Sequence, residues 1–438
     1  MAKKLGMSVL AASLLATGGF AADNITDAFK NAKVNGELTV FYQSMENAAA
    51  DKDLFKQNAS AADVGLKLGV TTEALDGFVF TATMYGVDTL GLENHMVSAI
   101  MVSPDAATDN DNDGPLNQLW WGEMNFAKTM GKTTVKMGRQ QINTPLCNSD
   151  TWNVHPNTFD AIVAINQDIP NLILVGAYVG NERATVAGAS APYSVLYGTN
   201  ATTGAQSGLL GASKTNGKYN TFFEEGAYAA AAIFTGIENT PIRLFYYDVT
   251  YIAQAMYADV ATKVAGVDLA AQYMSFTPAR YVKAVNDEST TAFGIKASGK
   301  VAGFGLMGAY TSVSSDGILA AANVADGQTK TPLYSATIIG DADVAGRPGT
   351  KGMKVSVSHD LGVKGLNLAL NYGSYDHDED VETTDSDSTS TELVAKYAAN
   401  EHTKLFVALA SYDHIAGYAA GKADTAENFF RTWVRFNY

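Results

Sequence analysis

The chain has 438 residues, of which 47% are hydrophobic and 17% are charged, and it carries a net charge of −15. The charged fraction is below the roughly 25% of soluble domains, which favours an outer surface that meets lipid, and the acidic balance argues against binding to nucleic acid. The only cysteine is Cys147, so an intramolecular disulfide and a pair of thiol ligands for a metal are excluded.

The first 21 residues are predicted to be a signal peptide. Two lysines at positions 3 and 4 precede an apolar stretch over 5–15, and small residues on both sides of Phe20 favour cleavage after Ala21, with Ala22 as the alternative. The apolar stretch is shorter than the ~20 residues of a membrane-spanning helix, which argues against an N-terminal anchor. Residues 22–438 are therefore expected to form the mature protein as one domain.

Apolar and polar residues alternate with a period of two from residue 33 onward. This alternation in segments of about ten residues is the signature of a transmembrane β-barrel, whose apolar side chains face lipid and whose polar side chains face a wet lumen. A soluble sheet would turn its apolar face inward instead. The side chains of Leu38, Leu66, Leu368 and Val434 are accordingly expected to face lipid.

Eighteen segments are predicted to be strands, so the expected fold is all-β: a closed antiparallel transmembrane barrel of about 18 strands. The segments are 33–43, 61–73, 77–86, 117–128, 132–140, 158–167, 170–181, 221–234, 240–249, 251–262, 264–276, 291–300, 302–313, 351–359, 365–375, 391–399, 402–412 and 427–438. The alternation is weakest in 221–234 and 251–262.

The connections between these segments alternate between short and long. The long ones cover 44–60, 87–116, 141–157, 182–220, 277–290, 314–350, 376–390 and 413–426. Only the link at Thr250 is short where a long one is due. Short periplasmic turns and longer outer loops are typical of outer-membrane barrels. An even number of strands returns both termini to the periplasm, so 22–32 is expected to be a short N-terminal periplasmic segment.

The last predicted strand ends with the chain and carries aromatic side chains on one face. Phe430, Phe436 and Tyr438 share this face with smaller apolar residues. A terminal aromatic residue that closes an alternating strand resembles the recognition signal of barrel-assembly substrates. The terminus therefore favours the barrel independently of the internal segments.

Two stretches, 23–41 and 138–161, resemble OprD-type porins, especially those of the ε-proteobacterial type. The number of strands, the alternation of loops and the aromatic terminus extend this resemblance over the mature chain. It implies a passive diffusion channel for small polar or charged solutes and ions in the bacterial outer membrane. It also implies an 18-stranded barrel, often a homotrimer, in contact with the lipid bilayer and lipopolysaccharide, with a third outer loop folded inward to narrow the pore.

The 141–157 connection matches that third loop in position, and its predicted constriction residues are Asp150, Trp152 and His155. Porins of this family line the channel with arginines opposite acidic groups of the loop. Residues here whose parity predicts an inward, pore-lining side chain are Arg431, Arg435, Arg243, Lys136, Lys296, Lys354, Glu37, Glu123 and Asp268. A transverse field between such charges would select charged solutes, with Asp150 expected to face the arginines.

One acidic stretch, 109–114, resembles the start of a calcium loop. Asp109, Asp111 and Asp113 alternate and are followed by glycine, but the twelfth position is Trp120 instead of glutamate, which argues against an EF-hand. A solvated loop is favoured, with a weakly bound calcium ion as the alternative, and no other cofactor is expected.

Two other functions remain open: a surface structural or adhesive barrel, and an outer-membrane barrel hydrolase. A hydrolase could use His377 beside Asp376 and Asp378, or His414 beside Asp413. The chain contains neither a zinc-binding spacing nor a nucleophile elbow. We therefore expect that the protein is not an enzyme.

Overall fold

The computed structural model describes residues 22–46, 52–90, 92, 118–149, 151–183, 219–222, 225–284, 286–324, 330–338, 344–378, 387–413 and 427–438. Several predictions fall outside these residues: the signal peptide, the calcium candidates Asp109, Asp111 and Asp113, the constriction residue Asp150, and His414. Among the helices of the described ranges, none is long and apolar enough to cross a membrane.

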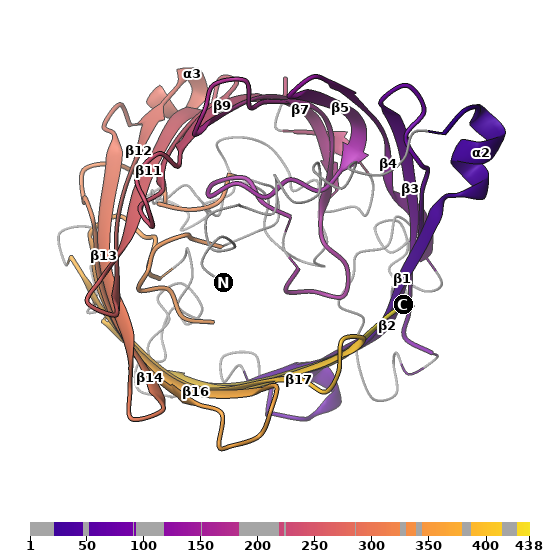
Figure 1. The fold of residues 1–438 in the computed structure, drawn as a ribbon. Coiled ribbons are helices and arrows are strands. Elements are labelled where there is room, and N and C mark those ends of the chain that lie inside the picture. Colours follow the sequence, from indigo (N-terminus) through magenta and orange to yellow (C-terminus); the bar gives the residue numbers. More distant parts are fainter. Residues whose placement is uncertain are drawn as a thin grey trace.

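The described residues form one antiparallel sheet that closes on itself, because β1 pairs with β19 (Figure 1). All eighteen predicted strands are present, and the only addition is β8, a two-residue strand beside β7. The strands are β1 (Lys33–Met45), β2 (Ser60–Thr71), β3 (Phe78–Asp88), β4 (Gln118–Met130), β5 (Thr133–Gln140), β6 (Thr158–Asn166), β7 (Leu172–Arg183), β8 (Asn220–Thr221), β9 (Ala227–Phe234), β10 (Ile242–Val249), β11 (Ala253–Val264), β12 (Val267–Pro278), β13 (Thr290–Val301), β14 (Phe304–Val313), β15 (Thr350–His359), β16 (Leu366–His377), β17 (Ser388–Ala398), β18 (Thr403–Asp413) and β19 (Glu427–Asn437).

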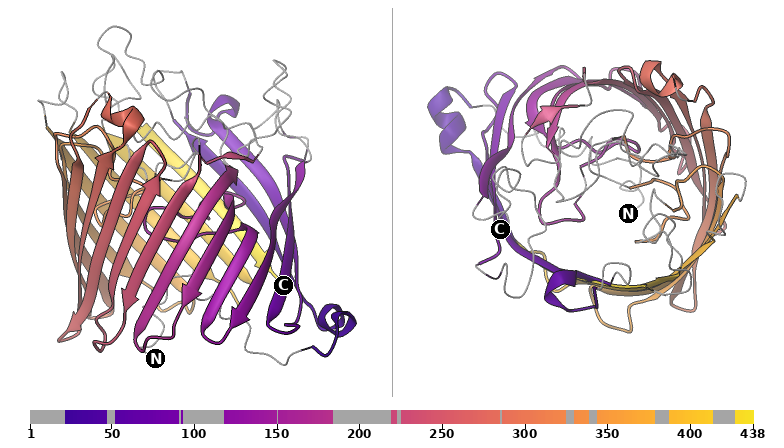
Figure 2. Two further views of the ribbon diagram at one scale, coloured as in Figure 1. Left: turned by 90° about the horizontal axis from the view of Figure 1, so that it is seen from above. Right: turned by 180° about the vertical axis from the view of Figure 1, so that it is seen from behind.

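The barrel has a short-turn end and a long-loop end, and its strands are tilted between them (Figure 2). The short link at Thr250 is confirmed: β10 ends at Val249 and β11 begins at Ala253 on the long-loop side. Helices are few in the described ranges: α2 (Ile25–Lys30), a 3-10 turn over Gln57–Ala59, and α3 (Arg280–Lys283). Helix α2 lies outside the wall at the short-turn end (Figures 1 and 2).

The outer face of the barrel is apolar and exposed. Leu38 pairs with Leu66 and with Phe436, and these side chains are 39%, 40% and 42% exposed. Leu368 and Val434 lie on the same outward parity. A slip of one residue would turn this set of side chains inward. A continuous apolar surface of this kind requires a lipid environment, since soluble monomers rarely expose such patches.

The barrel closes at a seam where the first strand, β1, pairs with the last strand, β19, and with the C-terminal residue Tyr438. Gly36 and Tyr438 exchange two backbone hydrogen bonds, each 3.1 Å long. The Tyr438 ring lies over Gly36, where a Cβ atom would collide with it. The Tyr438 ring thus covers Gly36, the residue of β1 that has no side chain of its own at the seam.

Truncation before Phe436 is expected to remove most of the assembled barrel from membranes. The change deletes the last pairs between β1 and β19, which leaves an unpaired strand edge. Heat-modifiable mobility in gels measures the folded fraction, and Tyr438→Phe, which keeps the ring, is the control and should assemble normally. Wild-type amounts of the truncated barrel would contradict the role given to the seam.

Candidate functional site: the interior of the barrel

Two connections fold into the barrel. The described part of 141–157, the first inner segment, leaves β5 and crosses the interior before it reaches β6 (Figure 1). The described part of 314–349, the second inner segment, also lies inside (Figure 1). The two segments meet where the backbone N–H of Val324 donates to the carbonyl oxygen of Leu146 at 2.7 Å. The inward path of the second segment was not predicted.

One side of the interior is packed with apolar side chains. Inward residues of β6, β9 and β10, such as Val163, Ile233 and Tyr247, form one cluster with Leu146 and Leu333 of the inner segments. Long stretches of the strands on this side, such as 227–234 of β9, are therefore apolar on both faces. The period-two signal is lost there for that reason, which explains why the segments for β9 and β11 were the weakest strand predictions.

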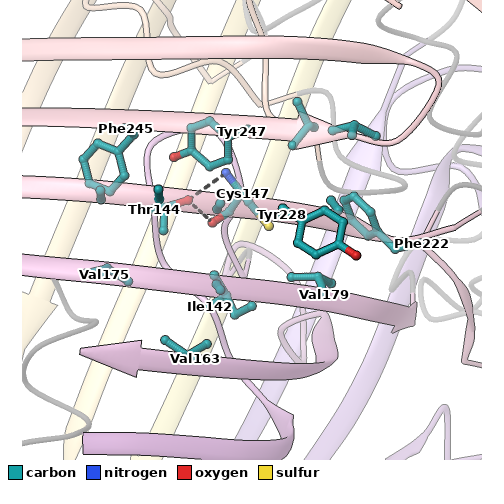
Figure 3. Close-up of a pocket in the computed structure, with 17 residues that line it drawn as sticks. Ile142, Thr144, Cys147, Val163, Val175, Val179, Phe222, Tyr228, Phe245 and Tyr247 are labelled. Atoms are coloured by element: carbon teal, nitrogen blue, oxygen red, sulfur yellow. Dashed lines mark hydrogen bonds between the residues drawn. The ribbon is translucent and has the colours of Figure 1, made fainter. Parts of the chain in front are cut away.

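A small cavity lies within this packing, between the first inner segment and the wall (Figure 3). Its volume is about 30 Å³, and its lining includes Ile142, Cys147 and Phe245. The cavity is too apolar to retain water and too small for a solute. Burial raises the pKa of the Cys147 thiol, which removes its reactivity at neutral pH. This side of the interior is structural.

The other side of the first inner segment is held by two arginines of β19. Arg435 donates to the carbonyl oxygens of Thr151 and Asn153, both at 2.7 Å. Arg431 donates to the carbonyl oxygen of Trp152 at 3.3 Å, and its guanidinium carbon lies 4.5 Å from the centre of the Trp152 ring. Both arginines therefore point inward, on the parity expected from the sequence, and they contact the backbone of the segment at residues 151–153.

The two described members of the predicted constriction set are packed against the wall. Trp152 lies 5.1 Å from Phe406 between ring centres. His155 is fully buried, stacks on Tyr85 at 4.8 Å, and donates from Nε2 to the carbonyl oxygen of Gly86 at 2.7 Å. Burial lowers the pKa of His155 to about 3, so the ring is neutral at neutral pH. His155 acts as an anchor for the segment.

Arg243 lies far from the other two arginines. It is on β10, on the opposite side of the strand order from β19, and its Nε donates to Asp259 at 2.7 Å. The Tyr257 hydroxyl donates to the same carboxylate at 3.1 Å. Asp259, which neutralises Arg243, was not among the predicted site residues. The structure therefore does not bring the three arginines together as one basic wall.

The remaining predicted lining residues also lie on the inward parity. Glu37 pairs with Lys67 at 2.8 Å, and Glu123 accepts from Gln141 at 2.8 Å. Lys136 is buried near Glu123, and the Lys296 amine lies 4.3 Å from the centre of the Tyr334 ring. Asp268 forms an ion pair with Lys263 at 2.9 Å. Lys354 donates to the carbonyl oxygen of Ala336 at 2.5 Å. Lys354 thus holds the second inner segment as Arg435 holds the first.

Metal and hydrolase sites find little support in the described ranges. They contain no group of three or more His, Cys, Asp or Glu residues that could hold a metal ion. His377 contacts Thr350 at 2.7 Å through Nδ1 and Ser388 at 3.5 Å through Nε2. All three side chains are buried, so a substrate has no access to this serine–histidine pair.

Comparisons with known proteins identify the fold. No family model matches the chain, and no curated protein matches it by sequence. OpdK of Pseudomonas aeruginosa, solved with vanillate, is 13% identical, and the match covers 94% of this chain and 99% of that one with a TM-score of 0.71. OccK8 (OprE) of the same organism is 14% identical over 94% and 99%, with a TM-score of 0.70.

A third structure, OccAB3 of Acinetobacter baumannii, is 13% identical over 93% of this chain and all of that one, with a TM-score of 0.71. OpdK is an outer membrane protein of Pseudomonas aeruginosa. The barrel expected from the resemblance to OprD-type porins is therefore confirmed: the chain has the closed, 18-stranded antiparallel fold of these outer-membrane proteins.

Proposed function

We propose that this protein is an outer-membrane porin, a passive diffusion channel for small polar or charged solutes, with its short-turn end in the periplasm. One observation carries the proposal: the large apolar cluster that includes the two inner segments occupies one side of the interior, whereas the apolar clusters on the other side are small. On the side of β15–β19, β1 and β2, inward charged side chains such as Lys354, Arg435 and Glu37 remain partly exposed. A water-filled passage along that wall accounts for charges that would be costly to bury in a filled barrel.

Anions are the solutes that this wall favours. Inward cations along it are Lys354, Lys396, Lys404, Arg431 and Arg435, and the register places Lys404 beside Arg435. A narrow passage with a lowered effective dielectric strengthens the attraction of such charges. OpdK was crystallised with vanillate, an aromatic carboxylate, which belongs to the same chemical class. The proposal also includes two predictions from the sequence: the inward residues line the passage, and residues 141–157 form its constriction.

Further parts of the proposal rest on the sequence. They are removal of a signal peptide over 1–21, assembly as a homotrimer, contact with lipopolysaccharide, and kinship with ε-proteobacterial members of the family. The resemblance of 23–41 and 138–161 supports the kinship and the trimer. No catalytic step is part of this function.

Swelling of proteoliposomes tests the proposal with three solutes of matched size. Gluconate is an anion, glucose is neutral and glucosamine is a cation. We expect gluconate to enter fastest and glucosamine slowest, because the exposed wall is rich in cations. An inserted, folded barrel that passes none of the three would contradict the porin, and faster entry of glucosamine would contradict the anion preference.

A further inference from the structure

Helix α2 is placed where a membrane surface would lie. It projects outward from the wall at the short-turn end, beside β1 and β3 (Figures 1 and 2). The proposed function puts this end at the periplasmic side of the outer membrane. A helix inside the lumen or below its mouth could act on the solute path, but a helix outside the wall cannot. Its position therefore calls for a different role.

The helix is fixed to the barrel through one face. Ala28 is buried, and its carbonyl oxygen accepts from the backbone N–H of Glu73 at 3.0 Å, in the turn between β2 and β3. The backbone N–H of Ala22 donates to Ala74 of the same turn at 2.8 Å, and the Asn31 amide donates to Glu73 at 2.7 Å. Contacts before, within and after the helix thus set its orientation.

The two flanks beside the docked face differ in polarity. Ile25 and Phe29 are four residues apart and so lie on one flank, and they are 65% and 53% exposed. Asp27 lies on the other flank, since each residue advances the helix by about 100°. Asn24 caps the helix by accepting from the backbone N–H of Asp27 at 3.0 Å. The docked helix therefore presents an apolar flank with Ile25 and Phe29 and a polar flank with Asp27.

The outer surface of the barrel beside α2 is also apolar (Figure 1). Val34, the first outward residue of β1, is 61% exposed, and Phe78 at the start of β3 is 52% exposed. Tyr438 is 62% exposed at the same end of the seam. Aromatic and apolar side chains at this level are typical of the belt at the membrane–water interface. Helix α2 adds the exposed Ile25 and Phe29 at this end of the barrel, outside the wall (Figure 1).

We propose that α2 is an interfacial anchor, whose Ile25 and Phe29 side chains insert into the periplasmic leaflet between phospholipid headgroups. The apolar flank enters the boundary of headgroups and acyl chains, and Asp27 stays in water, as in amphipathic helices that lie in the plane of the interface. The partner is thus the phospholipid surface, and no protein is needed to cover the flank. This inference rests on the membrane location in the proposed function.

Spin labels test the anchor in vesicles of phosphatidylethanolamine and phosphatidylglycerol. Single cysteines replace Ile25, Phe29 or Asp27 in a Cys147→Ala background, and collision with oxygen is compared with collision with a water-soluble nickel chelate. Asp27→Cys keeps the cap, because Asn24 accepts from the backbone. Leu38→Cys is the reference for the lipid-facing belt, and Glu401→Cys, on a turn whose side chain is 86% exposed, is the reference for water.

Labels at positions 25 and 29 are expected to collide several-fold more with oxygen, relative to nickel, than labels at 27 and 401, and less than the label at 38. Labels at 25 and 29 that match position 401 would overturn the anchor, and so would labels shielded from both reagents, which would show cover by protein. A water-like label at position 38 would instead show that the barrel is not embedded. Failure of the anchor and failure of the membrane location are thus distinguished.

Discussion

Replacing residues 143–156 with a short glycine–serine linker is expected to raise single-channel conductance several-fold and to weaken solute selection. The segment crosses the interior between the apolar cluster around Leu146 and the arginines of β19. Its removal widens the passage and removes the groups that face the wall. Gln140 pairs with Phe159, so a short linker can close the hairpin between β5 and β6.

This deletion also exposes apolar wall residues, so its folding must be measured with its conductance. Heat-modifiable mobility reports whether the barrel is closed. Trp152→Ala is a milder companion, because it keeps residues 142–149 in the core and removes only the ring between Phe406 and Arg431. We expect a smaller rise in conductance from it. Unchanged conductance in a folded deletion variant would place the segment outside the solute path.

Neutralising Arg431 and Arg435 together, as Arg431→Gln and Arg435→Gln, is expected to lower the ratio of anion to cation permeability several-fold. Two positive charges leave the part of the interior where these arginines contact 151–153. The reversal potential across a salt gradient measures the ratio. The change should be largest at low salt, because screening is then weak.

Two control variants separate the effect of the positive charge of these arginines from the effect of their hydrogen bonds to the first inner segment. Arg435→Lys keeps the charge on a shorter side chain, which weakens the two hydrogen bonds that Nη2 of Arg435 donates to Thr151 and Asn153. It should therefore preserve selectivity while raising conductance. Arg139→Gln removes one positive charge from the outward parity of β5, where Arg139 pairs with Asp160 at 2.8 Å, and should leave the reversal potential unchanged. An unchanged reversal potential in the double variant would remove Arg431 and Arg435 from the selectivity mechanism.

The strands were predictable because a wall between lipid and water forces alternation on each of them. β1 shows this directly: Leu38 and Val40 are exposed outside, while Glu37 and Thr39 point inward. Parity alone therefore placed the inward charges. It could not place their partners, because pairs such as Arg243 with Asp259 depend on register between strands, and register is set by the turns.

The inner segments were only half predictable. The path of 141–157 followed from a family resemblance and from position, whereas the connection 314–350 was interpreted as an ordinary outer loop. One signal was available: the run 318–322 is wholly apolar, and Leu319 to Ala322 are buried. An apolar run in a loop that is expected to face water indicates cover by something else. Strands that are apolar on both faces, such as β9, give the matching signal on the wall.

Single-channel recording of the wild-type protein in planar bilayers tests the central claim most directly, with the folded state of the sample checked by heat modifiability. A passage along the charged wall predicts discrete conductance steps without any energy source. It also predicts that the reversal potential shifts in the direction of higher cation permeability when Arg431 and Arg435 are neutralised. A folded, inserted barrel that shows no conductance steps would contradict the claim that its interior is an open channel.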